Sequence, residues 1–168
     1  MQTININNIN HIEKIYVDID GVLADFQKSA EKKAGCSIEE LMKQNKWQEF
    51  KKNLCFSDFF LELEEMPLVE VLKKHIGKFE IITACGNYNT EQVSKMKKTW
   101  IAKTLGKEVK VHCVIKSHEK ANFANSKSLL IDDRPKSVMP FIKSGGHAIL
   151  FDNAKSQIDE IENILNCK

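Results

Sequence analysis

Two aspartates directly follow the first apolar run of the chain. Asp18 and Asp20 flank Ile19, and Gly21 comes next. Side chains alternate along an extended strand, so carboxylates two residues apart can point the same way. Glycine then lets the chain turn away at once. Two carboxylates this close repel each other, which indicates a bound cation, and Mg²⁺ prefers such oxygen ligands.

A second acidic pair follows another apolar run. Asp132 and Asp133 come directly after Leu129-Leu130-Ile131. In an open parallel sheet the carboxyl ends of the strands lie at one edge, where ligands bind. The sequence therefore predicts a Mg²⁺ site at that edge, built from Asp18, Asp20, Asp132 and Asp133. The residues alone leave open which of Asp132 and Asp133 contacts the metal directly.

A hydroxyl group and lysines lie between the two acidic pairs in the sequence. Thr83 ends the run Ile81-Ile82-Thr83, while Lys116 and Lys120 follow a run that ends at Ile115. Position along the chain favours Lys116 over Lys120 as the lysine of this site, since Lys116 directly ends a predicted strand. Carboxylates, a hydroxyl and an ammonium group thus occur in order, each at or just after the end of an apolar run.

The elements that must hold these residues can be read from the hydrophobic pattern. Five short apolar runs predict strands, at 14–19, 79–83, 109–115, 128–131 and 147–151. Helical spacing predicts helices at 68–76, 89–105, 135–143 and 156–165. Asn89 and Gln92 are placed to form a capping box. Strands that alternate with helices predict an α/β fold with a parallel sheet covered on both faces.

One connection is too long for a single crossover helix. About 60 residues separate Asp20 from Phe79. We interpret 27–65, which is rich in Lys, Glu and aromatic residues, as a helical cap inserted after the first strand. Residues 1–26 and 66–168 would then form the core.

The order of these residues resembles the haloacid-dehalogenase (HAD) superfamily of phosphohydrolases. Four motifs carry the resemblance: Asp18-x-Asp20-Gly21-Val22, Thr83, Lys120 and Asp132-Asp133. The resemblance implies a Rossmann-like core with about five parallel strands and a small cap after strand 1. The longer runs 18–26 and 129–135 resemble the 5'(3')-deoxyribonucleotidase family within that superfamily. That family implies Mg²⁺-dependent hydrolysis of nucleoside monophosphates.

The resemblance also assigns roles to residues. Asp18 would be the nucleophile that forms an aspartyl-phosphate, and Asp20 the general acid and base. Thr83 and a lysine would hold the phosphoryl oxygens. The family places that lysine on the helix after the strand, which favours Lys120 over Lys116. Mg²⁺ would bind the Asp18 carboxylate, the Asp20 backbone carbonyl and a carboxylate of Asp132 or Asp133.

Several further residues have two interpretations. Phe26 matches a family residue that contacts the base or sugar, and it could equally be a core residue. Five other aromatic residues of the insertion could stack on a base or form the core of the cap; they are Trp47, Phe50, Phe56, Phe59 and Phe60. Ala84 stands where the nucleotidases continue with serine. Cys85 is expected to be a buried, inert thiol.

Composition excludes several classes of protein. The 25 Lys and Arg against 23 Asp and Glu give a net charge of +2, which does not indicate a nucleic-acid or membrane partner. No apolar stretch is long enough to span a membrane, and residues 1–14 lack the apolar region of a signal peptide. Five scattered cysteines without a CxxC pair favour a reducing cytoplasm over disulfides or zinc. Six lysines around one helix are predicted to form a solvated face; they are Lys95, Lys97, Lys98, Lys103, Lys107 and Lys110.

The resemblance implies a small phosphate monoester as the partner, and a homodimer is left open. Three alternatives remain: a HAD phosphatase for another small phosphometabolite, a phosphatase acting on nucleic-acid ends, and a HAD fold kept as a non-catalytic binding protein.

Overall fold

The core of the protein is a five-stranded sheet. A computed structural model describes residues 11–168, so most of the segment on which the signal-peptide prediction rests lies outside the described residues. The strands are β1 (Lys14–Val17), β2 (Glu80–Ala84), β3 (Val111–Val114), β4 (Ser128–Asp132) and β5 (His147–Leu150). They run parallel in the order β3-β2-β1-β4-β5. The predicted α/β fold is confirmed.

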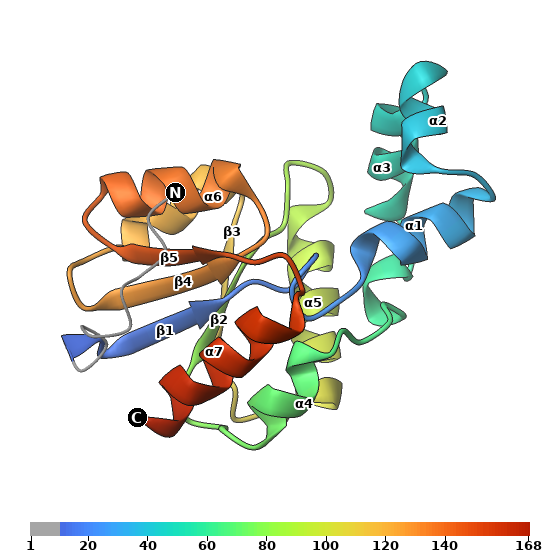
Figure 1. Ribbon diagram of the computed structural model, residues 1–168. Coiled ribbons are helices and arrows are strands. Elements are labelled where there is room, and N and C mark those ends of the chain that lie inside the picture. The colour runs from blue at the N-terminus through green and yellow to red at the C-terminus, as the bar shows by residue number, and fades with distance from the viewer. Residues whose placement is uncertain (1–10) are drawn as a thin grey trace.

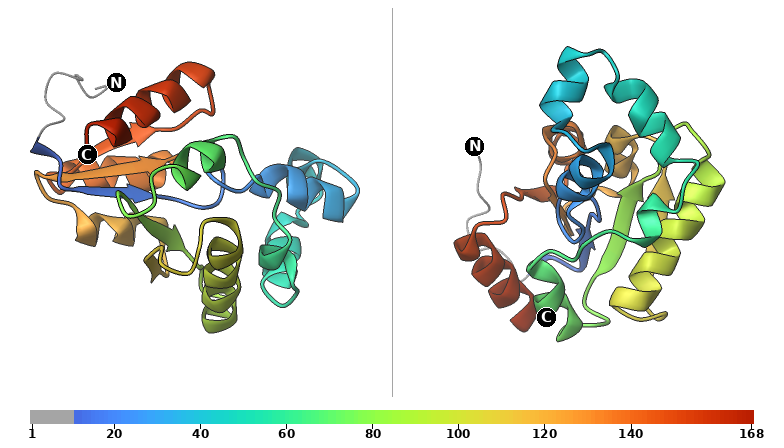
Figure 2. Two further views of the ribbon diagram at one scale, coloured as in Figure 1. Left: turned by 90° about the horizontal axis from the view of Figure 1, so that it is seen from below. Right: turned by 90° about the vertical axis from the view of Figure 1, so that its right-hand side faces the viewer.

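Helices cover both faces of the sheet (Figures 1 and 2). One face carries α4 (Leu68–Lys73), α5 (Thr90–Thr104) and α7 (Lys155–Asn166), which contribute to the larger buried cluster. The other carries α6 (Pro135–Lys143) and the 3₁₀ helix η3 (Ser117–Phe123), which pack on Tyr16 and Leu130. The helix predicted at 68–76 ends earlier than expected, at Lys73.

The long connection after β1 is helical, as predicted. It contains α1 (Phe26–Ala34), α2 (Ile38–Lys43), α3 (Trp47–Leu54) and the 3₁₀ helix η2 (Phe59–Leu61). Helices α1 to α3 stand beside the sheet, at the right of Figure 1. The two segments that lead in and out are paired, since Asp25 N donates to Glu64 O at 2.9 Å and Met66 N to Leu23 O at 2.7 Å. The division into a core and a cap at 27–65 stays a prediction.

Two side chains tie the start and middle of α5 to the insertion. Asn89 caps α5 without a side-chain capping bond, so the predicted capping box with Gln92 is wrong. The Asn89 amide instead donates to the Cys55 carbonyl oxygen at 2.7 Å, and Asn89 itself adopts a left-handed backbone. Trp100 Nε1 donates to the Leu63 carbonyl oxygen at 2.9 Å.

Within residues 11–168, none of the helices combines the length and the apolar character that a bilayer crossing requires. All five cysteines are free thiols.

We expect Trp100→Phe to destabilise the protein by about 1–3 kcal/mol, because the buried Leu63 carbonyl loses its donor. Urea denaturation followed by circular dichroism measures this free energy of unfolding. Trp47→Phe is the matched control, since the Trp47 indole makes no hydrogen bond to any of residues 11–168. Equal losses in the two variants would contradict the importance of the Trp100 hydrogen bond.

Candidate active site

The two acidic pairs meet because β1 and β4 are neighbours in the sheet. Val17 pairs with Ile131, so Asp18 and Asp132 leave the same edge side by side. Asp18, Asp132 and Asp133 each offer a carboxylate oxygen, and these oxygens all lie within 4.8 Å of one another. Asp18 and Asp132 are buried, while Asp133 is half-buried. The structure thus brings together three of the four carboxylates that were predicted to bind a metal.

Gly21 allows the two acidic segments to approach each other. Its φ of +78° lies in the left-handed region that favours glycine. A Cβ atom at this position would overlap the Asp133 carboxylate. The chain then turns tightly, with Leu23 N and Ala24 N both donating to Ile19 O at 2.9 Å. The absence of a side chain at Gly21 therefore leaves the space in which Asp133 reaches the site.

Lys120 is the cation between the two strands. Its Nζ lies 2.8 Å from Asp18 Oδ1 and 2.6 Å from Asp132 Oδ2, and the residue is 1% exposed. Burial opposes the charged form, but the charges of Asp18 and Asp132 outweigh burial and raise the pKa of Lys120. Lys116, which strand position alone favoured, is exposed. Of the two candidate lysines, the structure places Lys120 at the carboxylates.

A second buried lysine was missed. Lys97, which the sequence analysis assigned to a solvated face, is 1% exposed, and that assignment is wrong. Its Nζ donates to Asp20 Oδ2 at 2.6 Å, Thr83 Oγ1 at 3.1 Å and Ala84 O at 2.8 Å. Burial disfavours its charge, but Asp20 and Asp18 raise its pKa. The lysine joins the remaining predicted residues, Asp20 and Thr83, to each other.

The sequence did contain a signal for Lys97. The buried residues of α5 include Val93, Met96, Trp100 and Ile101. Because Lys97 lies four residues after Val93 and four before Ile101, it belongs to the same helix face. A lysine on an otherwise apolar face needs a buried anion, and Asp20 supplies it.

The four carboxylates face only two buried ammonium groups, so the fully ionised site has a formal excess of two negative charges. Burial, and then the negative charge of Asp18, raises the pKa of Asp132 to about 6 and that of Asp133 to about 7. Both Asp132 oxygens have partners, since Oδ2 accepts from Lys120 and Oδ1 from Arg134 N. Asp133 Oδ1 is buried and has no partner among the described residues.

This donor set fits Mg²⁺. A hard divalent cation takes carboxylate oxygens and balances the excess charge. Asp18 and Asp133 would hold it, and the unpartnered Asp133 Oδ1 favours Asp133 over Asp132 as the direct ligand. The roles assigned to all these residues stay predictions.

The aromatic residues of the insertion pack mainly on one another. The Phe26 ring lies 5.4 Å from that of Phe59, 6.3 Å from that of Phe60 and 6.4 Å from that of Trp47, measured between centroids. Phe60 also lies 5.2 Å from the Lys97 ammonium. Phe26 therefore belongs to an aromatic cluster beside the site, and Phe56 is 64% exposed.

Comparisons with known proteins identify the fold. No protein-family model matches the sequence, and the curated proteins contain no significant match. A hydrolase from Streptococcus pneumoniae TIGR4 superposes with a TM-score of 0.54 and 14% identity, over 91% of this chain and 99% of that chain. A predicted HAD-like family hydrolase from Porphyromonas gingivalis gives a TM-score of 0.51 and 15% identity, over 92% and 98%. The chain has the HAD-like fold. At these identities the likeness shows the fold alone.

We expect MgCl₂ to raise the melting temperature more at pH 8 than at pH 5. The pKa of Asp133 rises from 3.8 to about 7 on folding, so between these values the folded protein binds the proton more tightly. The metal-free protein therefore loses stability as pH rises through this window. At low pH, protons compete with the metal for the carboxylate.

The Asp133→Asn variant should melt higher than the native chain in the metal-free state at pH 8, because a repelling charge is gone, and it should lose its response to MgCl₂. Thermal scans with and without MgCl₂ measure both effects. Asp159→Asn, at an exposed position, is the control. An undiminished MgCl₂ response in Asp133→Asn would exclude Asp133 as a ligand.

Proposed function

We propose that this chain is a Mg²⁺-dependent phosphate monoester hydrolase that acts on nucleoside monophosphates. The observation that carries the proposal is the position of Asp18. This carboxylate lies at the carboxyl edge of a HAD-like sheet, 2.8 Å from the Lys120 ammonium and within reach of Asp132 and Asp133. A nucleophile, a cation and metal-binding acids are the parts that phosphoryl transfer requires.

In the first step, a carboxylate oxygen of Asp18 attacks phosphorus. The bond between phosphorus and the ester oxygen breaks, and an aspartyl-phosphate forms. Asp20 donates a proton to the leaving alkoxide. Asp20 is suited to this exchange because its side chain is 27% exposed, whereas Asp18 is buried.

In the second step, Asp20 takes a proton from water, and the resulting hydroxide attacks phosphorus. The bond between phosphorus and Asp18 breaks, which releases inorganic phosphate and restores the Asp18 carboxylate. Lys97 holds Asp20 Oδ2, while the buried Oδ1 has no partner among residues 11–168 and is the oxygen that would carry the proton. Lys97 is thus a positioning residue for Asp20.

Charge neutralisation accompanies both steps. Lys120 and Thr83 would hold phosphoryl oxygens beside Asp18. When bound, Mg²⁺ would neutralise negative charge on the phosphoryl group and orient it toward Asp18. Both lysines are already buried and in place, so little reorganisation is needed as charge develops.

The nucleoside part of the proposal rests on the sequence runs 18–26 and 129–135 and on the aromatic cluster beside Lys97. Rings at this position could contact a base or sugar. We place the activity in the cytoplasm, where free thiols are maintained. Activity on sugar phosphates or on oligonucleotide ends would instead indicate another small-molecule HAD phosphatase or a nucleic-acid phosphatase.

We expect the native chain with MgCl₂ to hydrolyse nucleoside 5'- or 3'-monophosphates, and Asp18→Asn to lose about 10³-fold or more in kcat because the nucleophile is gone. Release of inorganic phosphate from a panel of nucleotides, sugar phosphates and 5'-phosphorylated oligonucleotides measures this. The exposed-site variant Asp159→Asn should keep full activity. Ligand binding without turnover of any ester would indicate a non-catalytic binding protein.

We expect Lys97→Met to lose about 10²-fold in kcat on a nucleotide but clearly less on 4-nitrophenyl phosphate. The nitrophenolate leaves without a proton, so the mispositioned Asp20 matters less. Asp20→Asn should show the same dependence on the leaving group. Lys95→Met, at an exposed position of α5, should leave both rates unchanged. Equal losses on both substrates would mean that Lys97 does not act through Asp20.

A further inference from the structure

Strand β3 forms one edge of the sheet and pairs only with β2. Along such a strand, the backbone groups of alternate residues point toward the neighbouring strand or away from it. Cys85 N donates to Val114 O at 2.8 Å, so Val114 faces β2, whereas the backbone groups of Val111 and Cys113 point outward. The outward N–H and C=O groups of these two residues have no hydrogen-bond partner among residues 11–168. This part of β3 is therefore an open sheet edge.

The protein satisfies neighbouring parts of its sheet edges. Ile115, the next residue along the chain with an outward N–H, donates to Glu119 Oε2 at 2.9 Å. At the opposite edge, the Gln157 amide donates to the carbonyl oxygen of Leu150, on β5, at 3.0 Å. All four residues of β3 are partly exposed, so a partner can reach the open backbone groups.

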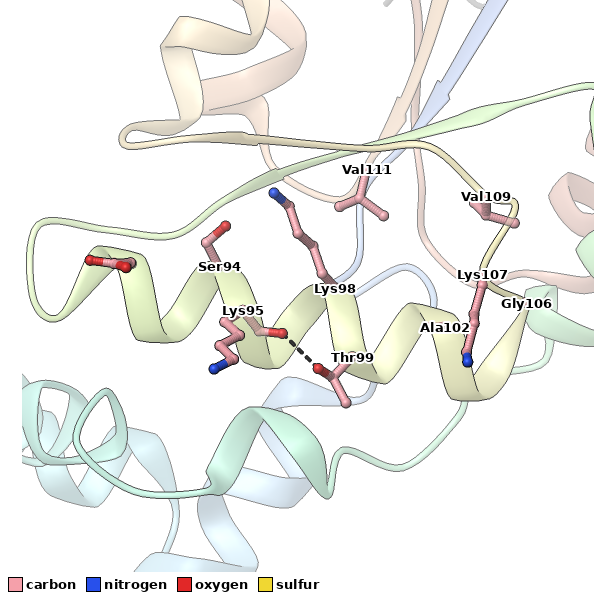
Figure 3. Close-up of a pocket in the computed structure, with 10 residues that line it drawn as sticks. Ser94, Lys95, Lys98, Thr99, Ala102, Gly106, Lys107, Val109 and Val111 are labelled. Carbon is pink, nitrogen blue, oxygen red and sulfur yellow. Dashed lines mark hydrogen bonds between the residues drawn. The ribbon is translucent and has the colours of Figure 1, made fainter.

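A groove of about 620 Å³ lies beside this edge, between α5 and β3. Ser94 and Lys98 line it from α5, and Val111 lines it from β3. Figure 3 shows Ser94 and Lys98 rising from α5 on the side that faces Val111. None of the proposed catalytic residues lines this groove. Because side chains alternate along a strand, a strand added to β3 would place every second side chain on the groove side.

The groove carries an excess of positive charge. Lys95, Lys98 and Lys107 line it, and none of the three has an ion pair with residues 11–168. The groove lining contains one carboxylate, that of Glu91. Lysines that protect an edge strand from aggregation lie on the strand itself, but β3 (Val111–Val114) contains no lysine. The charge of the groove is therefore complementary to acidic side chains on an added strand.

We propose that β3 is the docking site for an extended acidic segment of a partner protein, which adds to the sheet as a further strand. Val111 and Cys113 exchange backbone hydrogen bonds with this segment. The acidic side chains at every second position of the segment lie on the groove side, near Lys95, Lys98 and Lys107. The backbone hydrogen bonds supply affinity, and the charge of the groove selects the sequence of the segment.

Two other occupants of the edge fit the charge of the groove less well. Pairing of β3 with β3 of a second copy would bring the lysines of two such grooves together, and like charges oppose association. Residues 1–10 of the chain contain neither Asp nor Glu, so they do not supply acidic side chains. The charge of the groove therefore favours an acidic segment of another protein.

The test titrates the full chain into a fluorescein-labelled peptide that alternates glutamate and valine, and follows fluorescence anisotropy. We expect saturable binding with a Kd below about 1 mM, at least about tenfold tighter than for a peptide that alternates lysine and valine. The glutamate–valine peptide with N-methylated backbone amides should bind much more weakly, because it cannot donate to the open carbonyl oxygens of β3. Equal binding of the acidic and basic peptides, or of the parent and N-methylated peptides, would overturn the proposal.

Hydrogen exchange followed by NMR locates the bound peptide. In the free chain, the amide hydrogens of Val111 and Cys113 should exchange readily with solvent, and the acidic peptide should protect both. Protection that appears at β5 instead would overturn the proposal. Protection already present in the free chain, in a dimer or a monomer, would mean that a second copy or the chain itself occupies the edge, and would also overturn it.

Variants separate the groove charge from the open edge. Lys98→Glu should weaken binding of the acidic peptide at least about tenfold, whereas Lys103→Glu, which changes an exposed α5 lysine outside the groove, should not. Val111→Pro removes an outward N–H without removing a bond to β2, and should also weaken binding. Circular dichroism checks that each variant is folded. Equal losses in Lys98→Glu and Lys103→Glu would mean that general charge, rather than the groove, holds the peptide, and would overturn the proposal.

Discussion

The charge balance at the carboxyl edge of the sheet is the constraint on which the site depends. Buried carboxylates are costly unless a cation or hydrogen-bond donor satisfies them. Lys120 meets this requirement for Asp18 and Asp132, while Asp133 keeps a buried oxygen without a partner. The buried lysines of the protein thus neutralise only part of the negative charge of the carboxylates at this edge. The remaining part is a reason for a divalent cation to bind here rather than at an exposed acidic patch.

Helix α5 connects that edge to the helical insertion. The Lys97 ammonium group donates to Asp20 Oδ2 and lies 5.2 Å from the centroid of the Phe60 ring, which belongs to the insertion. Asn89 and Trp100 donate to backbone carbonyl oxygens of the insertion. One helix therefore positions the proposed acid–base residue and the structure beside it together. A change in the packing of the insertion would reach Asp20 through a short series of direct contacts.

The sequence predicted the strands and their acidic ends well, because the apolar runs are short, separate and followed by polar residues. Lys97 was missed because its neighbouring lysines suggested a solvated face, although the spacing of Val93, Met96 and Ile101 placed it on the buried one. The role of Asn89 depends on a contact with Cys55, 34 residues away, which no local pattern reports.

The two lysines explain how two aspartates only two residues apart can differ in role. Asp18 and Asp20 leave the same strand, and in water they would behave alike. In the fold, Asp18 is buried against Lys120, whereas Asp20 is partly exposed and held by Lys97. A buried carboxylate fixed beside a cation suits attack on phosphorus, and a partly exposed one suits proton exchange with a leaving group or water. The proposed division of labour would thus come from the environments that β1, α5 and η3 build around two identical side chains.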